Sequence, residues 1–87
     1  MVLVIVEREF DDPVDVRALF KKESEGAWCL EAHGVRYLET FLSRDRRKMV
    51  CLYDAPDAEA VRTAERRIDM PVTRVWTADR RTTPPDE

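Results

Sequence analysis

The chain has 87 residues, of which 44% are hydrophobic and 38% are charged, with a formal net charge of −3. A chain of this length has room for one small core, and charges of both signs spread along it are typical of a well-solvated globular domain. The acidic balance argues against nucleic-acid binding, which favours basic domains.

The first predicted element is a buried strand. Residues 2–6 form a continuous run of aliphatic and β-branched side chains, typical of a strand covered on both faces. The apolar start is too short to span a membrane or to form a signal peptide, so we expect a soluble cytoplasmic protein. The segment DDP (residues 11–13) breaks the strand, and helical spacing of apolar residues then extends from Val14 to His33, where Gly34 is a suitable helix-ending residue.

The remaining elements alternate in the same way. Residues 35–43 and 48–53 are predicted strands, and the SRDRR turn between them makes them a hairpin. Asp57 is placed to cap a second helix, which Pro71 ends. Residues 72–77 form a fourth predicted strand.

The predicted order of elements is therefore β-α-β-β-α-β. This is the ferredoxin-like arrangement, an α+β fold in which a four-stranded antiparallel sheet carries both helices on one face. We expect the domain to span residues 1–77 and a disordered tail to span residues 78–87. Because so small a domain covers its apolar surface poorly, we also expect a homodimer that forms through the open face of the sheet.

The alternation of side chains along each strand divides the sheet residues between two faces. One set is aliphatic, and we expect the helices to cover it. The other set holds the aromatic side chains and a few polar groups, and we expect it on the open face. The aliphatic set is Val4, Val6, Leu38, Leu42, Val50 and Leu52, and the aromatic set is Leu3, Ile5, Glu7, Tyr37, Glu39, Phe41, Met49, Cys51, Tyr53 and Trp76.

The stretch WCLEAHGV contains the only histidine and one of the two cysteines, which make no disulfide framework. Cys29 and His33 are four residues apart and would stack on one helix face. A bend of the helix at Gly26 leaves open whether that face points to the sheet or to solvent. Thiolate and imidazole bind divalent transition metals, but two ligands make an incomplete site. The simpler interpretation is that Cys29 is a half-buried small residue and that His33 interacts with the helix C-terminus.

Three other residues are candidate ligands. Glu23 lies within the apolar stripe of the first helix, where a carboxylate must pair with a nearby arginine, be protonated or meet a ligand. Glu7, at the end of the first strand, is otherwise an ion-pair partner at the edge of the sheet. Cys51, in the middle of a strand, is otherwise a small core residue, and it becomes a ligand only if Glu7 or His33 lies next to it.

Two alternatives to metal binding stay open. The first is a small-molecule binder or cofactor-free enzyme, isomerase-like or oxygenase-like, with a pocket on the open face lined by Tyr37, Tyr53 and Trp76. In that case Glu7 or His33 would act as a general base, and a tyrosine would donate to an oxyanion. The second is a dimer that recognises another protein and has no chemistry of its own.

Four segments form a pattern between Met1 and Trp76: VEREF, HGVRYLETFLS, CLYDAPDAEAVR and the closing VW. The block CLYDAPDAEAVR is the most specific of them. The pattern resembles a family of small bacterial domains of unknown function, one member of which is described as a nickel-binding protein. The resemblance implies the ferredoxin-like fold, pairing as dimers, and a bound nickel ion or another divalent transition metal.

This chain departs from the nickel-binding branch of that family. The branch carries histidines at the end of its first strand, where this chain has Glu7 and Arg8, and in its first helix, near Glu23. Only Cys51 is shared, and nickel favours imidazole and thiolate over carboxylate alone. The resemblance still makes a dimeric metal-binding protein the leading hypothesis, with candidate ligands His33, Cys51, Glu7, Glu23 and Cys29.

Overall fold

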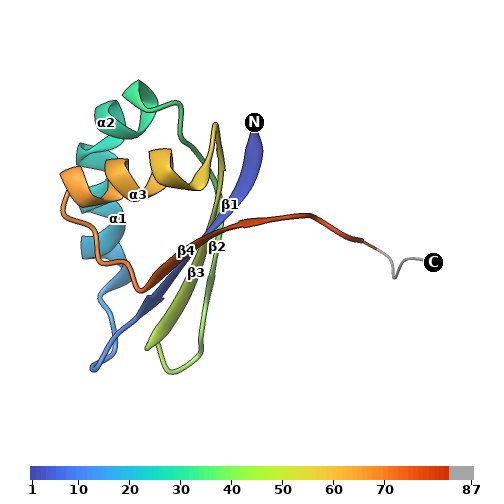
Figure 1. Ribbon diagram of the computed structural model, residues 1–87. Helices are drawn as coiled ribbons and strands as arrows, with labels where there is room; N and C mark the ends of the chain where they lie inside the picture. The colour runs from blue at the N-terminus through green and yellow to red at the C-terminus, as the bar shows by residue number, and fades with distance from the viewer. Residues whose placement is uncertain (83–87) are drawn as a thin grey trace.

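The computed structural model describes residues 1–82, and over this range the chain forms four strands and three helices. The strands are β1 (Val2–Glu9), β2 (Arg36–Leu42), β3 (Lys48–Ala55) and β4 (Arg74–Ala78). The helices are α1 (Val16–Glu25), α2 (Ala27–Ala32) and α3 (Ala58–Arg67). The sheet has the order β2-β3-β1-β4 with all neighbours antiparallel, and the helices cover one face (Figure 1), which confirms the predicted ferredoxin-like fold.

The C-terminal boundary stays a prediction. β4 begins at Arg74, two residues later than predicted, and ends at Ala78. The predicted tail overlaps this strand by one residue, and its last part, residues 83–87, lies outside the described residues. Among the described residues, none of the helices has the length and apolar character that crossing a membrane requires.

The predicted first helix is interrupted at Gly26, which separates α1 from α2. A Cβ atom on Gly26 would lie 2.5 Å from the Cγ2 atom of Ile68 at the end of α3, so only glycine allows this approach. Gly34 follows α2 with a φ of 72°, a conformation that glycine adopts without steric cost, as its predicted helix-ending role requires. The predicted cap at Asp57 is also confirmed, because its carboxylate accepts a hydrogen bond of 2.7 Å from the Ala60 N–H.

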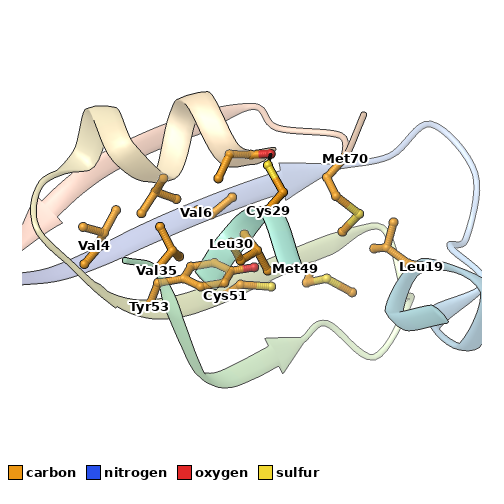
Figure 2. Packing of buried hydrophobic residues seen from close by; sticks show 13 residues of the cluster. Val4, Val6, Leu19, Cys29, Leu30, Val35, Met49, Cys51, Tyr53 and Met70 are labelled. Carbon is orange, nitrogen blue, oxygen red and sulfur yellow. Dashed lines mark hydrogen bonds between the residues drawn. The ribbon is translucent and has the colours of Figure 1, made fainter. Parts of the chain in front are cut away.

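The strand register corrects part of the predicted face assignment. β1 and β3 pair so that Val4 lies opposite Tyr53 and Val6 opposite Cys51, which places even-numbered residues of β1 beside odd-numbered residues of β3. Val4 and Val6 do lie beneath the helices, as predicted. The assignment of β3 was wrong: Met49, Cys51 and Tyr53 pack into the core beneath the helices (Figure 2), and Val50 and Leu52 face the open side.

A bulge divides the edge strand β2. Tyr37 lies opposite Tyr53, whereas Glu39 lies opposite Leu52, so the extra residue between them is Leu38. Tyr37 therefore shares the helix-covered face with Tyr53, which corrects its predicted place on the open face. Glu39 keeps its predicted place on the open face with Leu52.

Candidate functional site

Four polar side chains form a buried charge cluster beneath the helices: Arg8, Glu23, Tyr53 and Glu65. Arg8 of β1 is 1% exposed, Glu65 of α3 is 0% exposed and Glu23 of α1 is 8% exposed. Tyr53 of β3 is also fully buried. Charged side chains are almost never buried to this degree unless they are paired, so the cluster is the most unusual chemical feature of the core.

The Arg8 guanidinium lies at the centre of this cluster. Its Nη2 donates to Tyr53 Oη at 3.0 Å, to Glu65 Oε1 at 3.3 Å and to Glu23 Oε2 at 3.4 Å. Its Nη1 donates to the carbonyl oxygen of Pro71, and the Tyr53 hydroxyl donates to Glu23 Oε2 at 2.7 Å. One guanidinium thus joins two helices, two strands and the segment that leads into β4.

The cluster contains two carboxyl groups but only one cation. Burial raises the pKa of Glu23, and the nearby charge of Glu65 raises it further, against the opposing effects of Tyr53 and Arg8. Burial and the charge of Glu65 both favour the protonated, neutral form of the Glu23 carboxyl group. A proton held by Glu23 leaves one negative charge for Arg8 to balance.

Arg8 keeps its positive charge in this environment. Burial by itself lowers the pKa of Arg8, but the charge of Glu65 and the neighbouring Tyr53 and Cys51 groups outweigh burial, so the net pKa is raised. Burial and the two carboxyl groups raise the pKa of Tyr53, which keeps its phenol neutral. The Arg8 Nε atom and Glu65 Oε2 are buried without a hydrogen-bond partner among the described residues.

Glu7 lies on the opposite face of the sheet from this cluster. Its carboxylate accepts hydrogen bonds from Arg74 Nη2 at 3.2 Å and from the Trp76 indole N–H at 2.6 Å. The hydrogen bond with Arg74 and then that with Trp76 lower the pKa of Glu7. Glu7 therefore forms an ion pair on the open face and does not approach the other candidate ligands.

Cys51 packs beneath the helices rather than beside His33. Its Sγ lies 3.3 Å from Thr40 Oγ1. The structure brings neither Glu7 nor His33 to it, so the condition under which Cys51 becomes a ligand is not met within one chain.

Cys29 and His33 do lie together at the end of α2. His33 Nδ1 is 2.9 Å from the Cys29 carbonyl oxygen and 3.8 Å from Cys29 Sγ. Cys29 is 1% exposed, and its Sγ also lies 4.0 Å from the Ala64 carbonyl oxygen. His33, which is partly exposed, thus interacts with the C-terminus of α2. The Cys29 thiol lies close to the same nitrogen atom, Nδ1.

The three aromatic residues expected to line a ligand pocket lie in different places. Tyr53 belongs to the buried charge cluster, and Tyr37 lies at the edge of the helix-covered face with 43% of its surface exposed. Trp76 is on the open face next to Glu7. Over the described part of one chain, these three residues therefore do not line a single pocket.

Sequence reasoning missed Arg8 and Glu65, although both carry a periodic signal. Arg8 follows Val4 and Val6 at two-residue steps, which places it on the same face of β1. Glu65 follows Val61 by four residues, which places it on the buried stripe of α3.

A model of the family described as "Nickel responsive protein SCO4226-like" matches residues 5–77. The chain belongs to this family. This finding confirms the resemblance seen in the sequence. The crystal structure of SCO4226 from Streptomyces coelicolor A3(2) matches with a TM-score of 0.79 and 12% identity, covering 92% of this chain and 99% of that chain, a likeness that shows the fold alone. No curated protein matches the chain.

The family name raises the question of whether these residues fit a nickel ion. Over residues 1–82, no group of three or more His, Cys, Asp or Glu side chains has the arrangement of a metal site. The buried charge cluster offers mainly oxygen atoms, whereas nickel favours imidazole and thiolate, and Arg8 already supplies its cation. The cluster therefore does not fit nickel, and the pair of Cys29 and His33 offers two ligands.

Proposed function

We propose that the protein is a homodimer that binds a divalent transition metal such as nickel, with Cys29 and His33 of each chain as its ligands. The observation that carries the proposal is the 3.8 Å separation between Cys29 Sγ and His33 Nδ1. Thiolate and imidazole bound to one ion with tetrahedral geometry lie ~3.6 Å apart, given typical metal–sulfur and metal–nitrogen bond lengths. Membership of the nickel-responsive family supports the same choice of metal.

Metal binding at this pair requires the loss of a proton. Cys29 must lose its thiol proton, and His33 Nδ1 must give up its contact with the Cys29 carbonyl oxygen to present a lone pair. Other ligands, such as water, would fill the remaining positions. We therefore expect the affinity for metal to rise with pH.

The dimer would form through the open face of the sheet. Phe41 and Trp76 are 59% and 46% exposed on this face, beside the apolar side chains of Ile5 and Leu52. An apolar sheet face gains stability when a second copy covers it. Light scattering coupled to size exclusion would test this assembly, and a Phe41→Glu, Trp76→Glu variant should be monomeric. A wild-type monomer would contradict it.

A cytoplasmic location also belongs to this proposal. Both cysteines are free thiols, which a reducing compartment would maintain. Reduced Cys29 is the form that can bind the metal.

Isothermal titration of tag-free, metal-stripped protein with Ni²⁺, Zn²⁺ and Cu²⁺ tests the metal site. We expect saturable binding of one ion per chain that is lost in both Cys29→Ser and His33→Ala. Cys51→Ser is the matched control, because Cys51 is an equally buried thiol without a neighbouring imidazole. Binding that survives both changes at the pair, or is lost only in the Cys51 variant, would contradict the proposed ligands.

A further inference from the structure

A groove between α1, α2 and β2 opens beside the buried charge cluster. Its volume is about 300 Å³, and its lining residues are Phe20, Glu23, Ser24, Ala27, Leu30 and Tyr37. A second hollow of about 420 Å³ adjoins it and shares Ala27, Leu30 and Tyr37. Among the described residues that line the first hollow, Glu23 alone has a carboxyl group, so one acidic side chain lines an otherwise mostly apolar groove.

Aromatic rings lead from the groove toward the buried charge cluster. Phe20 and Tyr37 meet edge to face with ring centroids 6.4 Å apart, and Tyr37 meets Tyr53 in the same way at 5.9 Å. Phe20 is 38% exposed and Tyr37 43% exposed, so both are open to a ligand. Aromatic faces attract cations, and their apolar area favours a ligand with a hydrophobic body.

The charge balance of the cluster indicates what the groove would take. Within residues 1–82, Arg8 from β1 is the one cation that faces Glu23, and Glu65 from α3 is a second acid. Tyr53 and Cys51 from β3 are the other titratable groups around them. Glu65 Oε2 is fully buried without a hydrogen-bond partner among residues 1–82. Two carboxyl groups and one guanidinium leave the cluster one positive charge short of neutrality when both acids are ionised.

We propose that the groove binds a small apolar primary amine in its ammonium form, with the Glu23 carboxylate as the counter-ion. The ammonium group would supply the missing positive charge, and the apolar body would lie against Phe20, Leu30 and Tyr37. Glu23 is suited to this role because Tyr53 and Arg8 hold one of its oxygens, Oε2, in a fixed position. A divalent metal is less suitable, because it would exceed the missing charge beside a guanidinium.

At a pH below the raised pKa of Glu23, binding would replace the carboxyl proton with an ammonium ion. The carboxyl proton passes to solvent, the ammonium ion enters with its own proton, and the carboxylate and ammonium pair. Calorimetry in two buffers with different heats of ionisation should therefore detect a proton release that is largest in acid and decreases as the pH rises through that pKa. This inference does not depend on the metal proposal, because Cys29 and His33 are not among the lining residues.

Phenethylamine is the probe, and phenethyl alcohol is its neutral counterpart of nearly the same shape. We expect saturable binding of the amine, and affinity lower by about tenfold or more for the alcohol and for Glu23→Gln, because each removes a charge-assisted hydrogen bond. Glu31→Gln, in the adjoining hollow, is the matched control and should bind the amine as wild type does. Ala27→Trp should abolish binding by filling the groove while leaving Glu23 in place.

Three outcomes would overturn the proposal: equal affinity for the amine and the alcohol, undiminished binding of the amine by Glu23→Gln, or no saturable binding of the amine to wild-type protein. Backbone amide spectra recorded with each variant would show that it is folded. Those spectra should also show that the amine perturbs Phe20, Ala27 and Tyr37 in the wild type.

Discussion

Glu7 and Arg8 are neighbours in β1, yet they belong to regions of opposite character. Glu7 pairs with Arg74 on the open face, where water reaches both partners, and this pairing lowers its pKa. Arg8 pairs with Glu23 and Glu65 beneath the helices, yet there the pKa of Glu23 is raised. The difference teaches that burial and a second carboxyl group can outweigh an adjacent guanidinium.

Equivalent substitutions on the two faces give the largest expected contrast. Arg8→Met should destabilise the protein by about 3–5 kcal/mol, because it leaves two buried carboxyl groups without their cation. Arg74→Met should change stability little, because Arg74 is a solvent-exposed partner. Urea denaturation of both variants measures the contrast. Equal losses of stability would show that burial does not distinguish the two regions.

Removal of one hydroxyl tests how the buried charge cluster is held together. Tyr53→Phe should cost about 1–3 kcal/mol, because the hydroxyl both donates to Glu23 and accepts from Arg8 in a buried site. Thermal and urea unfolding would measure this loss, with Tyr37→Phe as the control, since the Tyr37 hydroxyl is exposed and its partner is the hydroxyl of Thr40. A Tyr53 variant as stable as that control would contradict the role assigned to the network.

The pH dependence of Glu23→Gln tests the raised pKa. The folded protein holds the Glu23 proton more tightly than the unfolded chain, so this contribution is complete below the ordinary value of 4.5 and is lost as the pH rises through the raised pKa. Glutamine does not titrate, so the variant should gain stability relative to wild type over that window. Urea denaturation from below pH 4.5 to neutral pH measures the gap, and a constant gap would exclude the raised pKa.

Glu7→Gln should give the smallest effect, with the opposite dependence on pH. The lowered pKa of Glu7 means that its contribution is present above the ordinary value of 4.5 and is lost as the pH falls through the lowered value. The variant should therefore be slightly less stable than wild type at neutral pH and equal to it in acid. High salt should reduce the difference, because both partners are in contact with solvent. A difference that grows in acid would contradict this reading.

Local signals explain why most of the fold could be predicted. Asp57 and Gly34 mark helix ends through their own chemistry, and the aliphatic run of residues 2–6 identifies β1 without knowledge of its neighbours. Gly26 also indicated a possible bend in the first helix. The break between α1 and α2, however, depends on the close packing of Gly26 against Ile68, which is distant in sequence.

The face assignment failed because it depends on pairing rather than on composition. Cys51 and Tyr53 look suited to an open face, yet the register with β1 places them beneath the helices. The candidate site failed for a different reason: Arg8 shares the face of β1 that Val4 and Val6 were correctly expected to bury, but its charge argued against a place in the core until the acidic partners from the helices are known. Glu23 was identified because its helical stripe is a local property, whereas its partners come from three other elements.

The bulge at Leu38 also protects the edge of the sheet. β2 is an edge strand, and such strands offer unpaired backbone groups on which another chain can add. A strand that docked there would meet a change of register between Tyr37 and Glu39, which interrupts the regular row of hydrogen bonds. The irregularity that turns Tyr37 toward the groove thus makes β2 a poor template for aggregation.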